Sequence, residues 1–248
     1  HGDDRRQRQM CIRDSVAVDL MEVERAAKTL LKNGCEAVCL FFINGYANPK
    51  NEKKAAESLR KIWPNEHVSV ATEILPEIRE FERCSTTTLN AYLQPPVANY
   101  LARIEDRIKE KNKTTEILIV QSNGGVMSIE TAKSRPIKTA LSGPAAGVVA
   151  AREIASAAGF NNIITGDMGG TSFDVSLVAN GQNMLTAQAN IDFGMTIRTP
   201  MIEMTTIGAG GGSIAKIDKT GFLEIGPESA GSDPGPVCYG LGNTRPTV

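Results

Sequence analysis

The chain has 248 residues with 27 basic and 28 acidic side chains, so its charge gives no reason to expect nucleic acid or an anionic membrane as a partner. Hydrophobic residues make up 41% and charged residues 22%, which argues against a disordered chain. No run of 18 apolar residues occurs, so no membrane span is predicted, and the odd number of five cysteines argues against a disulfide framework and favours a cytoplasmic location.

The first part of the chain predicts a β-α-β order after an irregular start. Residues 1–15 carry four arginines and no hydrophobic period, and we interpret them as a non-native or disordered arm. Apolar residues recur at helical spacing over 20–32, and residues 37–43 form an apolar run suited to a buried parallel strand. Asn48 and Pro49 predict the start of a helix that reaches about Ile62, and a second strand covers 68–72. This order predicts a crossover unit in a layered α/β domain.

Residues 80–111 predict a mostly helical segment that is interrupted near Pro95 and Pro96. The polar run that follows is the predicted boundary, so we expect one domain over 16–113 and a second over 114–248. Twenty of the 23 glycines follow residue 120, which predicts strands joined by tight or ligand-approaching loops in the second domain.

The second domain has clear local signals. Residues 117–121 predict a buried strand, and Ser142 predicts the N-cap of a helix that ends before Gly159. Strands are expected over 163–166 and 172–178, and Asn180-Gly181 predicts a two-residue hairpin turn with residues 183–188 pairing back.

The strongest chemical signal is Asp167-Met-Gly-Gly-Thr-Ser-Phe-Asp-Val175. Asp167 ends a predicted strand, where its carboxylate suits Mg²⁺ or an attacking water. Gly169 and Gly170 let backbone N–H groups approach phosphate oxygens, and Thr171 adds a hydroxyl donor. A strand follows the glycines, which excludes a Walker A loop and a Rossmann turn because both lead into a helix. The competing interpretation is a tight hairpin whose aspartate only accepts turn hydrogen bonds.

Four further segments resemble ligand loops. The first is a glycine-rich loop against which a purine or ribose can lie, formed by Gly208, Ala209, Gly210, Gly211, Gly212 and Ser213. Ser142 and Gly143 open a helix whose N-terminus suits phosphate, although an ordinary capped helix explains them about as well. Residues 122–125 follow a buried strand. The loop 226–236, with Glu228 and Asp233, fits a site or a solvated turn equally, and the roles of these two carboxylates stay open.

Taken together, five motifs in this order resemble the hydantoinase A/5-oxoprolinase family. They are Gln121-Ser-Asn-Gly-Gly-Val-Met127, Ser142-Gly-Pro-Ala145, Asp167-Met-Gly-Gly-Thr-Ser172, Gly208-Ala-Gly-Gly-Gly-Ser213 and Gly226-Pro-Glu-Ser-Ala-Gly231. Two upstream stretches, Asn44-Gly-Tyr-Ala-Asn-Pro49 and Ile78-Arg-Glu-Phe-Glu-Arg-Cys-Ser-Thr86, are similar to the end of that family's N-terminal region.

The resemblance implies an α/β, actin-like ATPase fold of the ribonuclease H-like kind, with ATP and Mg²⁺ as cofactors. By this likeness the hairpin that carries Gly169, Gly170, Thr171 and Ser172 holds phosphates, and the loop 208–213 holds adenosine. Asp167 would work through Mg²⁺ and water, and Asp174 would support the hairpin. The implied reaction is hydrolysis of a cyclic amide after ATP phosphorylates its carbonyl oxygen. A hydantoinase B-type subunit or a fused second half is the implied partner.

The sequence also departs from the family pattern. The family opens with another Asp-Gly-Gly-Thr hairpin that nothing in residues 1–20 matches, and its members continue beyond the final Pro-Thr-Val. We therefore expect a fragment truncated at both ends that by itself is inactive and binds nucleotide weakly or not at all.

Two other functions fit the same motifs. One is a subunit of an ATP-dependent ketone carboxylase, in which phosphorylation activates a ketone or bicarbonate. The other is non-catalytic, either an actin-like nucleotide-dependent scaffold or an inactive fragment. Product analysis separates the two enzymes, and nucleotide binding separates both from an inert chain.

Overall fold

The computed structural model describes residues 16–111, 115–190 and 194–248, so the predicted N-terminal arm lies outside the described residues. The chain forms two compact units. The first unit comprises the chain up to Gln121 with Val126–Ala140 and Ala187–Pro200, and the second comprises Ser122–Gly125, Leu141–Thr186 and Met201–Val248. The chain therefore passes between the units several times, and the domain division at residue 114 stays a prediction.

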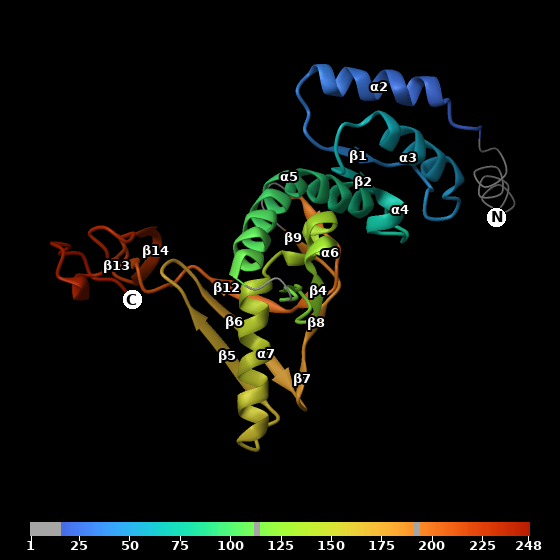
Figure 1. Cartoon of the computed structure of the whole chain (residues 1–248). Coiled ribbons are helices and arrows are strands. Elements are labelled where there is room, and N and C mark those ends of the chain that lie inside the picture. Colours follow the sequence, from blue (N-terminus) through green and yellow to red (C-terminus); the bar gives the residue numbers. More distant parts are fainter. Residues whose placement is uncertain (1–15, 112–114, 191–193) are drawn as a thin grey trace, which may run out of the picture. The chain divides into compact units, whose positions relative to one another are not determined.

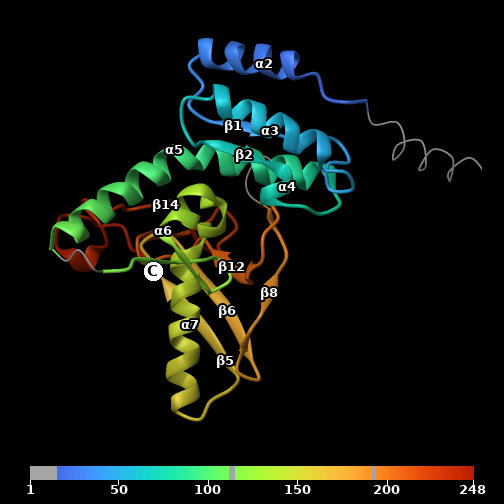
Figure 2. The ribbon, with the colours of Figure 1, turned by 45° about the vertical axis from the view of Figure 1, so that its right-hand side comes forward.

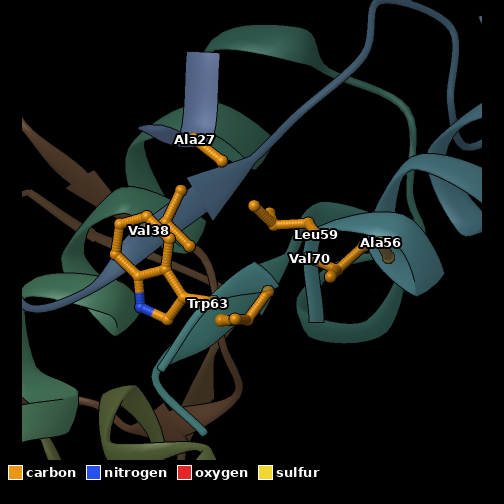
Figure 3. Packing of buried hydrophobic residues seen from close by; sticks show 7 residues of the cluster. Ala27, Val38, Ala56, Leu59, Trp63 and Val70 are labelled. Carbon is orange, nitrogen blue, oxygen red and sulfur yellow. The ribbon is translucent and has the colours of Figure 1, made fainter. Parts of the chain in front are cut away.

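The first unit contains the predicted β-α-β order. Helix α2 (Leu20–Lys32) leads to strand β1 (Val38–Leu40), helix α3 (Lys50–Ile62) and strand β2 (Val68–Val70), which pairs in parallel with β1. Both strands are shorter than predicted. Figure 3 shows the apolar side chains that α2 and α3 pack against this pair. The buried members are Ala27, Val38, Ala56, Leu59, Trp63, Val68 and Val70.

The predicted interruption near Pro95 and Pro96 is wrong, because helix α5 runs without a break over Glu80–Lys111. The helix curves visibly (Figure 1), as expected where prolines remove backbone donors. Two buried side chains just before the prolines attach the helix to its surroundings. The Asn90 amide donates to Ser69 Oγ (2.8 Å), and both the Asn90 and Gln94 amides donate to the Ser134 carbonyl (3.1 Å each). Tertiary hydrogen bonds thus hold a segment that local propensity disfavours.

A buried ion network joins α5 to α3. Arg83 and Glu52 are both 0% exposed, and Arg83 Nη2 lies 3.5 Å from Glu52 Oε2. Arg83 Nη1 also lies 2.8 Å from Glu80 Oε2, and its Nε donates to the Leu75 carbonyl. The second charge and the backbone acceptor compensate for the loss of water around the guanidinium.

We expect Arg83→Met to lower the free energy of unfolding by about 3–5 kcal/mol, because it leaves the Glu52 carboxylate buried without its cation. Arg60→Met is the matched control, since it removes an exposed pair with Glu73 and should cost about 1 kcal/mol or less. Urea denaturation of both variants measures the difference. Equal losses would show that the buried network contributes no more than the surface pair.

The rest of the first unit consists of short elements. Strands β3 (Leu118–Val120) and β4 (Val126–Ser128) form an antiparallel pair, as do β9 (Ala189–Asn190) and β10 (Thr196–Ile197). The remaining helical elements are α4 (Ala71–Ile74), α6 (Ile129–Ser134) and η1 (Pro136–Thr139).

The second unit is built on an antiparallel sheet in the order β12-β6-β5, formed by Met204–Ile207, Phe173–Ala179 and Ile163–Met168. Helix α7 (Ser142–Ala157) lies along β5 and β6 in both views (Figures 1 and 2), and Ala145 and Val148 of α7 share a buried cluster with Val178 and Ile202. Asn180 and Gly181 have φ of 52° and 71°, which confirms the predicted turn.

Short strands complete this unit. Strand β7 (Gln182–Asn183) pairs with β6, and β8 (Leu185–Thr186) pairs with β11 (Met201–Ile202). A hairpin of β13 (Ser213–Ile217) and β14 (Leu223–Ser229) precedes the short helix η3 (Val237–Tyr239). Both units therefore mix helices and strands. None of the helices in the described ranges is long and apolar enough to cross a membrane.

Candidate functional site

The aspartate-diglycine motif forms the bend between β5 and β6. The strands pair in register so that Asp167 lies opposite Asp174, and the Gly169 N–H closes the bend on the Ser172 carbonyl (2.9 Å). Strand β5 extends through Asp167 to Met168, and β6 begins at Phe173, so residues 169–172 are the tip. The tip is therefore a hairpin between strands, as the motif predicts.

The glycine-rich loop docks directly on this tip. The Gly211 N–H donates to the Gly169 carbonyl (2.9 Å), and the Gly212 N–H donates to the Gly170 carbonyl (2.6 Å). A Cβ at Gly210 would lie 2.4 Å from the Ser172 nitrogen, so only glycine permits this approach of one backbone to another. Gly210 and Gly212 are buried, which assigns their missing side chains to loop docking rather than to an open ligand surface.

This docking fixes which polar groups of the tip remain available. The carbonyls of Gly169 and Gly170 accept from the glycine loop, and the Thr171 carbonyl accepts from Ser213 Oγ (3.4 Å). The N–H groups of Gly170 and Thr171 have no acceptor among the residues that the structure describes. The exposed tip therefore presents donors, and a group of backbone donors favours an anion such as phosphate.

The loop 226–231 joins the same cluster. The Ala230 N–H donates to the Gly212 carbonyl (2.8 Å), and a Cβ at Gly226 would lie 3.1 Å from the Gly208 carbonyl. Glu228 forms a two-point ion pair with Arg245, whose hydrogen bond holds the pKa of the Glu228 carboxyl below its usual range. Glu228 thus has a structural partner in Arg245. Asp233 is exposed, and its role stays open.

Two carboxylates line a cavity of about 530 Å³ between α7 and the sheet. Asp167 and Asp174 lie in one register row on the face that α7 covers, and Pro144, Gly147 and Met204 line the same cavity. A Cβ at Gly147 would lie 3.8 Å from Asp167 Oδ2, so a small residue leaves room beside this carboxylate. Residues directly opposite in antiparallel strands lie about 4.5–5.5 Å apart, where like charges repel. A cation would relieve that repulsion.

The N-cap role predicted for Ser142 is wrong. Helix α7 begins at Ser142 itself, and the preceding Leu141 is left-handed, with φ 58°. A side-chain N-cap needs an extended backbone, so Leu141 opens the helix without one, and its carbonyl accepts from the Ala145 N–H (3.1 Å). Gly143 lies in the first turn, with no atom within 4 Å of where its Cβ would project.

The loop 122–125 packs at another part of α7. A Cβ at Gly124 would lie 2.7 Å from Val149 Cγ2, and the Ile202 N–H donates to the Ser122 carbonyl (2.8 Å). Four of the five motifs thus lie wholly in the second unit, and the motif Gln121–Met127 contributes Ser122–Gly125 to it. Backbone contacts at the tip join three of the motifs, namely the diglycine bend, the glycine-rich loop and the loop 226–231.

Two polar residues of this region were not predicted as part of a site. Thr206 Oγ1 donates to Asp174 Oδ1 (2.5 Å), and Arg245 holds Glu228. The pairing of β12 with β6 brings Thr206 opposite Asp174, and a register prediction for these strands could have found it. Arg245 belongs to none of the sequence motifs, so no signal in the sequence points to it.

The oxygen donors are compatible with Mg²⁺. Within the described ranges no three or more His, Cys, Asp and Glu side chains converge as metal ligands. Mg²⁺ keeps several waters and binds through one or two carboxylates together with phosphate oxygens. The Asp167–Asp174 pair, next to a tip with unpaired backbone N–H groups among the described residues, fits that donor set.

Comparison with known proteins shows the family of this chain. The family described as hydantoinase/oxoprolinase matches residues 83–248, and the hydantoinase/oxoprolinase N-terminal region matches residues 9–63. The caprolactamase subunit alpha of Pseudomonas jessenii is 40% identical over 86% of this chain and 30% of its own length. The acetophenone carboxylase gamma subunit of Aromatoleum aromaticum is 35% identical over 93% of this chain and 32% of its own.

A solved structure gives the same relationship. The crystal structure of the ATP-dependent caprolactamase from Pseudomonas jessenii superimposes with a TM-score of 0.76 and 39% identity, covering 91% of this chain and 33% of that one. The chain thus spans about a third of the length of these relatives. The family match covers well over half of the chain and includes every loop of the site described above. This chain belongs to the hydantoinase/oxoprolinase family.

Proposed function

We propose that the protein uses ATP to hydrolyse a cyclic amide, such as a hydantoin, 5-oxoproline or a related lactam. The observation that carries this proposal is the polarity of the β5–β6 tip. Its carbonyls are engaged by the glycine loop, and the N–H groups of Gly170 and Thr171 remain available for phosphate. The resemblance to an ATP-dependent caprolactamase supports the choice of a lactam.

An amide needs activation because resonance makes its carbonyl carbon a poor electrophile. In the proposed reaction the carbonyl oxygen forms a bond to the γ-phosphorus as the bond between that phosphorus and ADP breaks. One water then opens the ring C–N bond and a second releases phosphate, so the products are the ring-opened acid, ADP and phosphate. The protein's main contribution is to position these groups.

Each group of site residues has its own role in the proposed reaction. Gly169, Gly170, Thr171 and Ser172 would hold phosphates, with Ser142 and Gly143 at the positive end of α7 as further donors. Asp167 would hold Mg²⁺ and orient water, and Asp174 faces the same cavity. Mg²⁺, when bound, neutralises charge on the phosphate oxygens. Adenosine would lie against the exposed Gly208 and the half-buried Gly211 of the loop 208–213, because Gly210 and Gly212 are buried.

The proposal also includes an actin-like ATPase fold and a partner subunit. A four-stranded antiparallel sheet with one covering helix is compatible with part of an actin-like ATPase domain. Relatives named as alpha and gamma subunits support assembly with a second subunit of hydantoinase B type.

A ketone carboxylase subunit is the second candidate, and the likeness to an acetophenone carboxylase subunit favours it. The same phosphate site would serve both reactions, so the site alone does not choose between them.

The test incubates the intact protein, with its partner subunit where it has one, with ATP and Mg²⁺ in the presence of a lactam, a hydantoin, 5-oxoproline, or an aryl ketone with bicarbonate. We expect ADP and a ring-opened acid with a cyclic amide, measured by mass spectrometry. ATP consumption only with the ketone and bicarbonate would favour the second candidate. Absence of nucleotide binding would reject both.

A further inference from the structure

Three polar side chains form one row across the sheet of the second unit. Asp167 of β5 lies opposite Asp174 of β6, and Asp174 lies opposite Thr206 of β12. Residues paired in register project from the same face of a sheet, which here is the face that α7 covers. The row lies nearer the tip than the next one, which contains Thr165, Ser176 and Met204.

The two carboxylates of this row differ in the hydrogen bonds that they accept. Thr206 Oγ1 donates a 2.5 Å hydrogen bond to Asp174 Oδ1. The Asp167 carboxylate has no hydrogen-bond donor among the described residues. Asp174 is also less exposed than Asp167, and both line the cavity. One carboxylate is therefore held by its neighbour in the sheet, and the other is free to turn.

A carboxylate whose first oxygen is occupied presents its second oxygen in a defined direction. A β-branched side chain such as threonine has restricted χ1 freedom, so it is a stiff donor. Groups that hold a ligand residue in this way contribute strongly to metal affinity, because a ligand that is already oriented loses less freedom on binding.

We propose that Thr206 is a positioning residue that orients Asp174 towards the divalent cation accompanying ATP. This inference rests on the proposed function, because it assumes a cation between the phosphates and the carboxylate pair. The two carboxylates would then have different roles towards the cation. Asp174 would be held in a fixed orientation, and Asp167 would turn to fit the cation. The sequence motif gives no sign of this, because Thr206 lies 32 residues from Asp174.

The test compares Thr206→Val, which keeps the shape and removes the donor, with Thr206→Ser, which keeps a hydroxyl. Thr205→Val is the matched control, because Thr205 lies opposite Val175 on the other face of the same strand. The measurement is Mn²⁺ binding to the intact protein, followed by electron paramagnetic resonance, with thermal unfolding recorded in parallel.

We expect Thr206→Val to weaken Mn²⁺ binding by about 10- to 100-fold, and Thr206→Ser and Thr205→Val to stay near the wild-type value. The Mg²⁺ concentration that half-saturates ATP hydrolysis should rise in the same order. Unchanged Mn²⁺ binding in Thr206→Val, or equal losses of binding and thermal stability in all three variants, would overturn the proposal. A wild-type protein that binds Mn²⁺ but turns over no tested substrate would reject the proposed function and leave the role of Thr206 measurable.

Discussion

Replacing Asp167 by Asn should lower substrate-dependent ATP hydrolysis by at least about 100-fold while the fold stays intact. The amide has nearly the shape of the carboxylate, but it carries no charge to hold Mg²⁺ and cannot accept a proton from water. The Asp167 carboxylate has no hydrogen-bond donor among the described residues, so the change breaks no side-chain hydrogen bond with them. The measurement is ADP release by the intact protein with its cyclic amide, and circular dichroism reports the fold.

Glu203→Gln provides the control for loss of charge. Glu203 is exposed just before β12 and does not line the cavity, so we expect its turnover to match the wild type. The charge change is the same in both variants, and only the position differs. Wild-type turnover by Asp167→Asn would exclude any role of this carboxylate in the reaction.

The local features of the fold were predictable where one short segment determines them. Helix α2 has the apolar spacing and the following glycine that predict its ends, and Asn180-Gly181 supplies the two positive φ values that its turn requires. The Asp167 hairpin was predicted for the same reason, since two glycines between two apolar strands indicate a tight reversal. Each of these signals lies within about ten residues of the structure that it determines.

Features that depend on distant partners were not predictable in this way. The prolines of α5 predict a break, but buried hydrogen bonds from Asn90 and Gln94 hold the helix through it. Ser142 has the right residue type for an N-cap, but the left-handed Leu141 takes that position. The link from Thr206 to Asp174 depends on strand register, which the sequence pattern left open.

The glycine-rich loop shows the same limit at the site itself. The sequence predicts that its glycines expose backbone to a ligand. In the structure, two of them are buried, and their missing side chains allow the loop to dock on the diglycine tip. The loop therefore acts on the phosphate site in part indirectly, by engaging the tip carbonyls and leaving its N–H groups available.

This indirect role makes Gly210→Ala the most informative change outside the carboxylates. The added Cβ would lie 2.4–2.5 Å from backbone atoms of Thr171 and Ser172, and backbone cannot rotate away as a side chain can. We expect the two loops to separate, with a loss of about 1–3 kcal/mol in the free energy of unfolding. Nucleotide binding to the intact protein should weaken by more than about 10-fold, which corresponds to 1.4 kcal/mol.

Gly208→Ala is the matched variant for stability, because a Cβ at Gly208 meets no atom within 4 Å. Its free energy of unfolding should stay within about 1 kcal/mol of the wild type, since only the entropy of the unfolded chain changes. Urea denaturation measures stability, and titration with a fluorescent ATP analogue measures binding. If Gly210→Ala bound the analogue as tightly as the wild type, the docked loop would not be what prepares the tip for phosphate. In that case the free N–H groups of Gly170 and Thr171 would be a property of the hairpin alone.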